Sequence, residues 1–150
     1  MKRVCIISDT HGLLRDKVIA ELKKSDAVIH AGDIGSDAVL QSLKQYGTLY
    51  AVRGNNDVKW AKSLPDNLIF NIEGIRFYLI HNKKDVPRDL AGIDIVIYGH
   101  SHKYEETESN GILFLNPGGC GKRRFHLELN MCRMIINGTD YQYEKVIIET

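Results

Sequence analysis

The sequence has little of what marks disulfide-rich, exported or membrane proteins. Its cysteines, Cys5, Cys120 and Cys132, are odd in number and form no C-x-x-C pair, which argues against a disulfide framework and a thiolate zinc site. No apolar run approaches the roughly 18 residues of a membrane span. The short apolar segment after Met1-Lys2-Arg3 lacks the length and cleavage site of a signal peptide. We therefore expect reduced thiols, with Cys5 and Cys132 packed in strands, in a cytoplasmic protein.

An excess of charge of one sign is also missing. The 20 Lys and Arg residues against 19 Asp and Glu residues leave a formal net charge of +1, which gives no overall attraction to nucleic acid or to a membrane surface. The dense basic cluster is Lys122, Arg123 and Arg124. A solvated loop or strand end is its simpler interpretation, and a surface that follows nucleic-acid phosphates is the alternative.

No low-complexity stretch, linker or internal repeat divides the 150 residues. With 43% hydrophobic and 26% charged residues, the composition is that of a globular protein, and the length fits one domain at roughly 100–200 residues per domain. We expect one domain over residues 1–150.

The first two thirds of the chain alternate β-rich apolar runs with helical patterns, which is typical of βαβ units. The strands are expected at Arg3–Ser8, Asp26–Ala31 and Gly47–Arg53. Two helices are expected between them, the second capped by Ser36. Their apolar stripes are Leu14, Val18 and Leu22, then Val39, Leu40 and Leu43.

The pattern then changes to antiparallel pairs. Asn67–Ile72 and Ile75–Ile80 flank Glu73-Gly74 as a hairpin, and Ile93–Tyr98 is a continuous buried strand. Two Asn-Gly dipeptides, Asn110-Gly111 and Asn137-Gly138, favour type I′ hairpin turns, whose central residues both need positive φ. The predicted fold class is α/β, with two packed mixed sheets and helices outside.

The polar residues that bear chemistry follow directly after the apolar strands. They are Asp9, His11, Asp33, Asn55, His81, His100 and His102. Ligands bind at the carboxyl ends of the strands in open α/β sheets, so these loops should converge on one rim. Taken alone, each residue has a structural alternative, since strand-end histidines are often only hydrogen-bonded and an Asn after Gly often only supplies left-handed backbone.

Together these residues offer two carboxylates, one amide and four imidazoles, with no sulfur. Such nitrogen and oxygen donors suit Mn²⁺, Fe, Zn²⁺, Co or Ni rather than copper(I) or an iron–sulfur cluster. Seven ligands exceed what one ion needs. A pair of ions that shares one carboxylate accommodates them all.

The order D-x-H, G-D, G-N, H and G-H-x-H, followed by Asn116-Pro117-Gly118, resembles the calcineurin-like metallophosphoesterases. It is most similar to their small single-domain bacterial and archaeal phosphodiesterase branch, which includes the retromer subunit of eukaryotes. The resemblance covers Arg3 to about Gly118. It implies a four-layer αββα sandwich of two mixed sheets and the hydrolysis of phosphodiesters in preference to monoesters.

The resemblance also implies a role for each matching residue. One ion would be held by Asp9, His11, Asp33 and His102, and the other by Asp33, Asn55, His81 and His100, with Asp33 bridging. Two ions about 3.5–4 Å apart need such a shared anion, and a hydroxide that bridges them would be the nucleophile. Mn²⁺ is the preferred metal, with Ni²⁺, Zn²⁺, Fe²⁺ or Co²⁺ as alternatives. Catalysis would rest on Asp33, Asn55 and His100, and substrate binding on Arg53, Asn55 and Asn56.

Two departures from the family pattern concern substrate turnover. Asn56 stands where many members carry a general-acid histidine, so proton donation would need water, Asp57 or a good leaving group. After His81 the usual Gly-His is replaced by Asn82-Lys83, and Lys83 or Lys84 could attract a phosphate, although solvated lysines are the simpler interpretation.

Alternatives remain for two further residues, for the partner and for the function. His30 is expected to be structural, and Arg53 either meets a substrate phosphate or forms a salt bridge that braces its turn. The expected partner is a small phosphate ester, with nucleic acid weakly supported, no membrane, and a homo-oligomer left open. A noncatalytic metal-binding scaffold and a single-strand nuclease are the rival functions.

Overall fold

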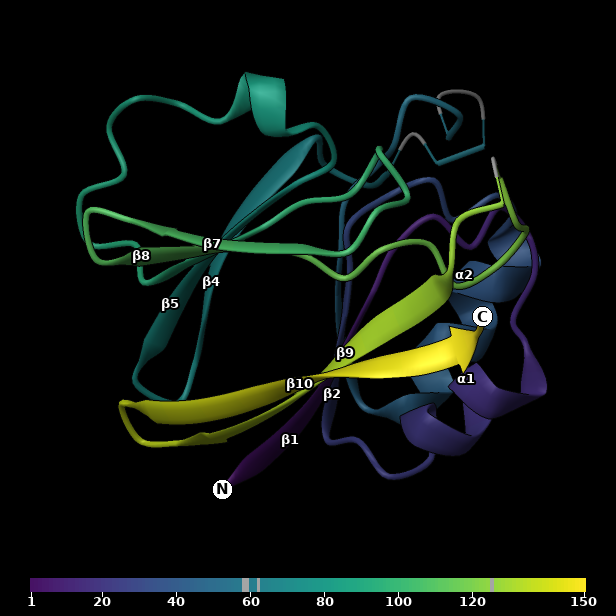
Figure 1. Ribbon diagram of the computed structural model, residues 1–150, viewed down its shortest axis with the longest axis horizontal. Helices are drawn as coiled ribbons and strands as arrows, with labels where there is room; N and C mark the ends of the chain where they lie inside the picture. Colours follow the sequence, from purple (N-terminus) through teal and green to yellow (C-terminus); the bar gives the residue numbers. More distant parts are fainter. Residues whose placement is uncertain (58–59, 62, 125) are drawn as a thin grey trace.

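Two five-stranded mixed β-sheets face each other in the computed structural model, which describes residues 1–57, 60–61, 63–124 and 126–150 (Figure 1). Sheet A has the order β10-β9-β1-β2-β3, and sheet B has the order β4-β5-β6-β8-β7. The strands of sheet A are β1 (Lys2–Ile7), β2 (Ala27–His30), β3 (Thr48–Ala51), β9 (Leu129–Asn137) and β10 (Asp140–Glu149). The strands of sheet B are β4 (Asn67–Ile72), β5 (Ile75–Ile80), β6 (Ile95–Ile97), β7 (Glu105–Ser109) and β8 (Ile112–Asn116).

Helices α1 (Asp16–Leu22) and α2 (Asp37–Leu43) cover the face of sheet A that points away from sheet B (Figure 1). Ser36 caps α2 as expected, because its hydroxyl accepts a hydrogen bond from the backbone N–H of Val39. Leu14 lies before α1 rather than on it, yet it packs in the same cluster as Val18. Within the described ranges, no helix has the length and apolarity needed to cross a membrane.

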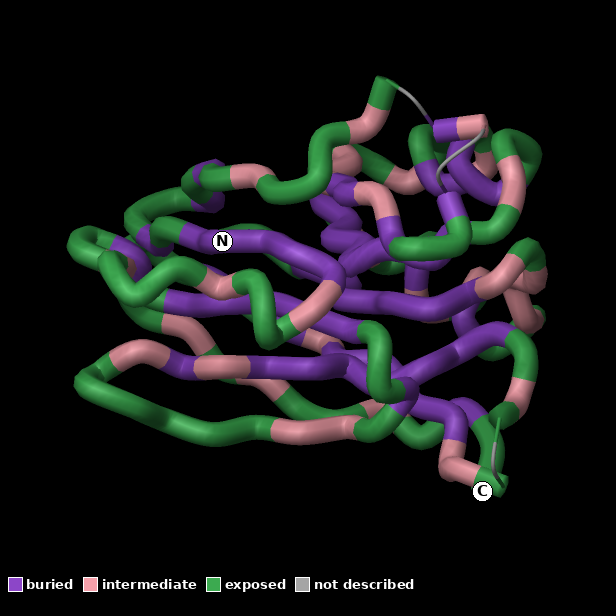
Figure 2. Tube along the Cα trace, turned by 90° about the horizontal axis from the view of Figure 1, so that it is seen from above, coloured by how far each residue is buried: buried purple, intermediate pink, exposed green. Residues whose placement is uncertain are grey.

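Alternation along the strands distributes side chains between two apolar layers. Val4 and Ile6 of β1 pack between the sheets, whereas Cys5 and Ile7 pack under the helices. This is the period of two expected for a strand that is buried on both faces. Buried segments accordingly run through the centre of the molecule, and exposed segments lie at the turns and along the edge strands β7 and β10 (Figure 2). The three cysteines are buried and free, as predicted.

The outer face of sheet B is covered by the segment that includes the short 3₁₀ helix η2 (Lys83–Asp85). Tyr78, Val96 and Tyr98 form an apolar cluster on this face with Val86, Leu90 and Ile93. A second short 3₁₀ helix, η1 (Lys44–Tyr46), follows α2. The predicted αββα sandwich is confirmed, and its layer over sheet B is made mostly of this irregular segment.

The hairpin prediction was right at one Asn-Gly dipeptide and wrong at the other. Asn110 and Gly111 both have positive φ, as a type I′ turn requires. Asn137 instead ends β9 and pairs with Asp140, so that Gly138 and Thr139 form the turn. Only Gly138 has positive φ there, which is the geometry that places glycine first in a type II′ turn.

Candidate metal centre

The loops after β1 and β2 lie side by side and bring two carboxylates together. The Asp9 N–H donates to the Gly32 carbonyl and the His11 N–H donates to the Asp33 carbonyl, each at 3.0 Å. The loop after β6 joins them, because the His100 N–H donates to Asp9 Oδ2 at 3.1 Å. The predicted convergence of the strand-end loops on one rim is therefore seen in the structure.

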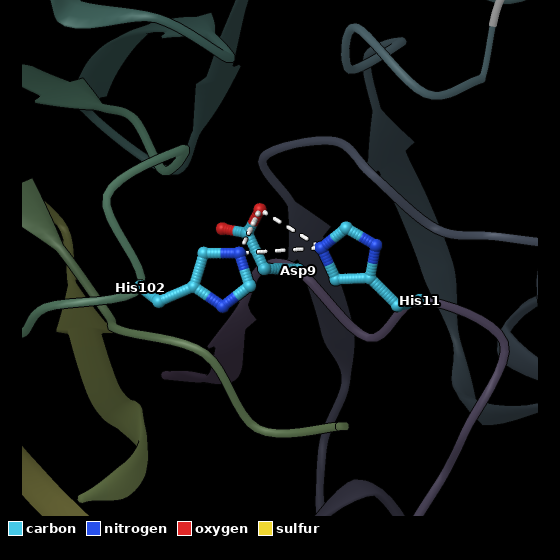
Figure 3. Close-up of side chains that lie close together, drawn as sticks. All are labelled: Asp9, His11 and His102. Atoms are coloured by element: carbon cyan, nitrogen blue, oxygen red, sulfur yellow. Dashed lines mark hydrogen bonds and ion pairs between the residues drawn. The ribbon is translucent and has the colours of Figure 1, made fainter. Parts of the chain in front are cut away.

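The first cluster is formed by Asp9, His11 and His102 (Figure 3). The Nε2 atoms of the two imidazoles lie 3.2 Å apart, and Asp9 Oδ1 lies 3.7 Å from His11 Nε2 and 3.5 Å from His102 Nε2. Asp9 is fully buried, and its Oδ1 atom has no hydrogen-bond partner among the described residues. A buried carboxylate oxygen that faces two imidazole nitrogens is suited to bind a cation between them.

The second cluster is formed by Asp9, Asp33 and His81. Asp33 Oδ2 lies 3.3 Å from His81 Nε2 and 3.7 Å from His11 Nε2, so it stands between the two clusters. The His81 Nδ1–H donates to the Ala31 carbonyl at 2.7 Å, which leaves Nε2 as the ligating atom. Asn55 Oδ1 lies 3.1 Å from that Nε2.

His100 is placed differently from the other six candidates. Its ring stands nearly perpendicular to that of His81, with the centroids 5.2 Å apart, and the residue is exposed. Its backbone, rather than its ring, contacts Asp9. Across the described chain, its ring nitrogens belong to neither cluster of mutually close donor atoms.

Left-handed backbone is concentrated at these residues. Eight non-glycine residues of the described chain have positive φ, and five of them are candidate ligands: Asp9, His11, Asp33, His100 and His102. Such a conformation costs on the order of 1 kcal/mol or more per residue and persists where the surrounding structure enforces it. This concentration indicates that the rim is a functional site.

Two glycines leave the room that the carboxylates occupy. A Cβ atom on Gly54 would lie 2.0 Å from Asp33 Oδ1, and one on Gly99 would lie 2.0 Å from Ser8 Oγ and 2.8 Å from Asp9 Oδ2. The glycines of the G-N and G-H-x-H motifs therefore have a steric function as well as a conformational one.

The charges at the rim favour a cation. Burial raises the pKa of Asp33, but the neighbouring His81 imidazole and the hydrogen bond from the Asn56 backbone more than offset it, so the pKa of Asp33 lies below its usual range. Burial likewise opposes ionisation of Asp9, but the neighbouring imidazoles of His11, His81 and His102 hold its pKa below the ordinary value. Burial lowers the pKa of His102, which favours the neutral imidazole that a metal requires.

Asp57 has a structural role that sequence analysis missed. This fully buried carboxylate accepts hydrogen bonds from the backbone N–H groups of Ile34, Gly35 and Gly54, at 3.0 to 3.1 Å. It therefore fixes the Asp33 loop against the Asn55 loop. The suggestion that Asp57 supplies a proton to the leaving group is wrong, because its oxygens are occupied and buried. No local pattern distinguishes this aspartate, since its partners on the other loop are 22 and 23 residues away.

Asn56 and Arg53 also face partners within the protein. The Asn56 side-chain amide donates to Asp33 Oδ2 at 3.1 Å, and its backbone N–H donates to Asp33 Oδ1 at 2.9 Å. The Arg53 guanidinium binds Asp66 at 2.9 Å, which is the salt bridge that sequence analysis kept as an alternative. Its Nε atom is buried and lacks a partner in the described structure. Arg53, Asn55 and His81 line a cavity of about 570 Å³.

His30 is structural, as predicted. Its Nδ1 atom accepts from the Gly32 N–H at 3.0 Å, so its Nε2–H donates to Thr10 Oγ1 at 3.0 Å, and the Thr10 hydroxyl donates to the Ile34 carbonyl. Both ring nitrogens are thus used within the loops. Burial lowers the pKa of His30 from 6.5 to about 4, and the charges of Asp9 and Asp57 offset only part of this effect.

This pKa predicts a loss of stability in acid. Between pH 6.5 and about 4, the unfolded chain binds a proton at His30 and the folded chain does not. The free energy of unfolding therefore decreases as the pH is lowered through this range. We expect a loss of up to about 3 kcal/mol from His30 over this window. Urea unfolding of metal-free protein, with His30→Gln compared with the wild type, measures it. The exposed His126→Gln is the control, and an unchanged pH slope in His30→Gln would contradict the assignment.

The basic cluster and His126 lie in the segment between β8 and β9. Arg123 donates to the carbonyls of Leu127 and Thr150 and pairs with Glu149, which agrees with the simpler, structural interpretation of the cluster. His126 is exposed and lies in a turn, whereas its alternation with Leu127 predicts a surface position on a late strand. The neighbouring Phe125 lies outside the described residues.

Residues 1–139 match the family described as the calcineurin-like phosphoesterase superfamily domain. The chain belongs to this family. A protein named probable metallophosphoesterase of Methanocaldococcus jannaschii is 34% identical over 130 residues, covering 75% of this chain and 65% of that protein. A second protein of that organism, named phosphodiesterase, is 30% identical over 139 residues, covering 79% and 84% of the two chains.

The solved structures that resemble this calcineurin-like domain share its fold. Vps29 of Chaetomium thermophilum gives a TM-score of 0.80 at 19% identity, covering 99% of this chain and 97% of that one. A structure described as a novel archaeal phosphodiesterase gives a TM-score of 0.76 at 23% identity, covering 97% and 99%. Both likenesses establish the two-sheet architecture.

A metallophosphoesterase family implies divalent metal ions, and the residues at the rim fit them. The orphaned Asp9 Oδ1 atom, the facing Nε2 atoms of His11 and His102, and the Nε2 atom of His81 are nitrogen and oxygen donors of the kind that transition ions bind. His102 Nδ1 is buried and lacks a partner among the residues described, and the backbone of Gly119 approaches it closely.

Proposed function

We propose that this chain is a metal-dependent phosphodiesterase with a two-ion centre. The observation that carries the proposal is the pair of overlapping donor clusters, Asp9–His11–His102 and Asp9–Asp33–His81, at one rim. Asp33 Oδ2 lies within 3.7 Å of an imidazole of each group, which supports the bridging role that the resemblance implies. The preference for diesters is supported by the relative named phosphodiesterase.

The proposed ligands form two sets, which are those that the family resemblance implies. One ion would be held by Asp9, His11, Asp33 and His102, and the other by Asp33, Asn55, His81 and His100, with Mn²⁺ as the preferred metal. When bound, the ions would supply an activated water and would neutralise charge on the phosphoryl oxygens.

The chain's own residues would orient the centre and the ester. The Asn56 amide and backbone hold Asp33 through both of its oxygens, and the Ala31 carbonyl fixes the tautomer of His81. Arg53, with its free buried Nε–H, lines the same cavity as Asn55 and would bind a phosphate oxygen there. The exposed ring of His100 is accessible to a bound ester.

Chelation tests the proposal. Wild-type protein reconstituted with Mn²⁺ is expected to hold two ions per chain and to hydrolyse an aryl phosphodiester, and complete removal of metal is expected to abolish the hydrolysis. Elemental analysis and release of the aryl alcohol measure the two quantities. Full activity without metal would reject the mechanism.

A noncatalytic scaffold is the second candidate, favoured by the similarity to Vps29. Metal binding alone is compatible with it. Protein that binds two ions but hydrolyses no monoester, diester or short oligonucleotide with any of the candidate metals would identify the scaffold.

The leaving group should limit the rate, because neither Asn56 nor Asp57 is placed to protonate it. The Asn56 amide faces Asp33 and the Asp57 carboxylate is buried, so alkyl diesters are expected to be cleaved far more slowly than aryl diesters. General-acid catalysis is typically worth 10²–10⁴-fold, and Asn56→His should recover part of it for alkyl esters alone. Rates across a series of leaving groups measure this. A flat dependence in the wild type would show that another group donates the proton.

A further inference from the structure

A second cavity adjoins His100, one of the proposed metal ligands. It has a volume of about 310 Å³, and its lining includes His100, Tyr98, Lys83, Lys84 and Glu105. Asn82 lines both this cavity and the larger one that contains Arg53, Asn55 and His81. The two cavities therefore flank the proposed metal centre, and a ligand in the smaller one adjoins His100.

One residue that lines the smaller cavity, Tyr98, carries an unsatisfied hydrogen-bonding group. Tyr98 follows β6 and is only 2% exposed, and its hydroxyl has no hydrogen-bond partner within the described part of the chain. A buried hydroxyl without a partner is costly, so the site favours a ligand that supplies an acceptor. Burial, with a smaller contribution from the charge of Glu105, raises the pKa of Tyr98 to about 12, so the hydroxyl stays a proton donor near neutrality.

A cationic group stands over the Tyr98 ring. The Lys83 ammonium lies 5.3 Å from the centre of the Tyr98 ring and 5.8 Å from that of Phe114. The Asn82 side chain accepts from the Lys84 N–H at 3.1 Å and thereby fixes the short turn that presents both lysines. Over the described ranges neither lysine forms an ion pair with a carboxylate, so both charges remain available to a ligand.

We propose that this cavity binds a second, non-scissile anionic group of the substrate, through the Tyr98 hydroxyl and the Lys83 ammonium. The proposal rests on the proposed function, and it names the substrate class: phosphate esters that carry a further phosphate, phosphonate or carboxylate. An anionic oxygen satisfies the orphaned hydroxyl and pairs with the lysine at once, which a neutral group does not. Tyr98 and Lys83 are specificity-determining residues in this scheme and take no part in bond cleavage.

The carboxylate of Glu105 allows the sign of the ligand's charge to be tested. It lines the same cavity and would repel an anion. Glu105→Gln is therefore expected to tighten anion binding several-fold, whereas Lys83→Gln weakens it about tenfold, the scale of one charge-assisted hydrogen bond. If the ligand were a cation, the two substitutions would change its binding in the opposite directions. If it were neutral, neither substitution would change its binding.

The kinetic experiment uses nitrophenyl phosphodiesters whose second alcohol is an alkyl chain ending in methyl, carboxylate or phosphonate, at a series of chain lengths. At the best chain length, kcat/KM for an anionic ester is expected to exceed that for the methyl ester about tenfold, mainly through KM. Tyr98→Phe and Lys83→Gln should each remove most of this advantage and leave the methyl ester unaffected. Tyr78→Phe, in the same apolar cluster but outside the cavity lining, and the exposed Lys44→Gln are the matched controls. The carboxylate and phosphonate series show which anion is preferred.

A binding experiment keeps the test independent of turnover. Inorganic phosphate is titrated into metal-free protein that carries ¹³C at the tyrosine Cζ atom, with the Tyr98 resonance assigned by its loss in Tyr98→Phe. The resonance is expected to shift with saturation, and Lys83→Gln should weaken the binding about tenfold. An unmoved Tyr98 resonance, or no advantage for any anionic ester in an active enzyme, overturns the proposal. Failure to hydrolyse every ester while the resonance shifts would reject the enzyme and leave the anion site standing.

Discussion

Asp33→Ala is expected to lose both metal ions and to lower kcat/KM for an aryl diester by about 10³-fold or more. Asp33 Oδ2 lies 3.3 Å from His81 Nε2 and 3.7 Å from His11 Nε2, so this one oxygen faces an imidazole of each proposed ion site. Removing it takes away the anion that offsets the repulsion between two cations. Loss of one electrostatic group at a reacting centre typically costs 10²–10³-fold, and here the loss of the ions adds to it.

Single-site variants provide the comparison. His11→Ala and His81→Ala should each weaken one ion chiefly, because each imidazole belongs to one of the two sets. Metal per chain after dialysis, with far-ultraviolet circular dichroism to confirm folding, measures the stoichiometry. Asp9→Ala is the decisive companion, since Asp9 Oδ1 also belongs to both clusters. Two ions retained by Asp33→Ala would refute the bridging assignment, and loss of both in Asp9→Ala alone would move the bridge to Asp9.

Asp57→Ala is expected to lower the free energy of unfolding by about 3–5 kcal/mol. The Asp57 carboxylate accepts three backbone N–H groups, those of Ile34, Gly35 and Gly54, and each buried donor left without an acceptor costs about 1–3 kcal/mol. The same bonds hold the loops of Asp33 and Asn55 together. Any Asp57→Ala protein that folds should therefore also bind metal more weakly.

Urea unfolding of the metal-free wild type and variant measures this effect without a contribution from bound ions. Asp16→Ala, at the exposed first turn of α1, is the matched control and should change stability by about 1 kcal/mol or less. Asp57→Asn keeps one carbonyl acceptor, so its loss of stability should lie between those of Asp57→Ala and Asp16→Ala. If Asp57→Ala changed the stability no more than the control, the hydrogen bonds of Asp57 would not stabilise the fold as predicted.

The sequence by itself determined where the strands lie and which types of polar side chain follow them at the rim. Alternation in β1 separates Val4 and Ile6 from Cys5 and Ile7, and this local period suffices to predict a strand buried on both faces. The polar residues begin where each apolar run ends. Since parallel strands place their carboxyl ends at one edge, their convergence followed from the order of the elements.

Only the tertiary structure decided which atoms face one another. The contact between His11 and His102 joins residues 91 positions apart, and that between Asn56 and Asp33 joins residues 23 positions apart. Such contacts depend on strand order and register, which hydrophobic periodicity does not encode. For the same reason the sequence offered Asp57 as a proton donor and did not reveal it as a buried brace, and it carried no sign that Tyr98 and Lys83 line one cavity.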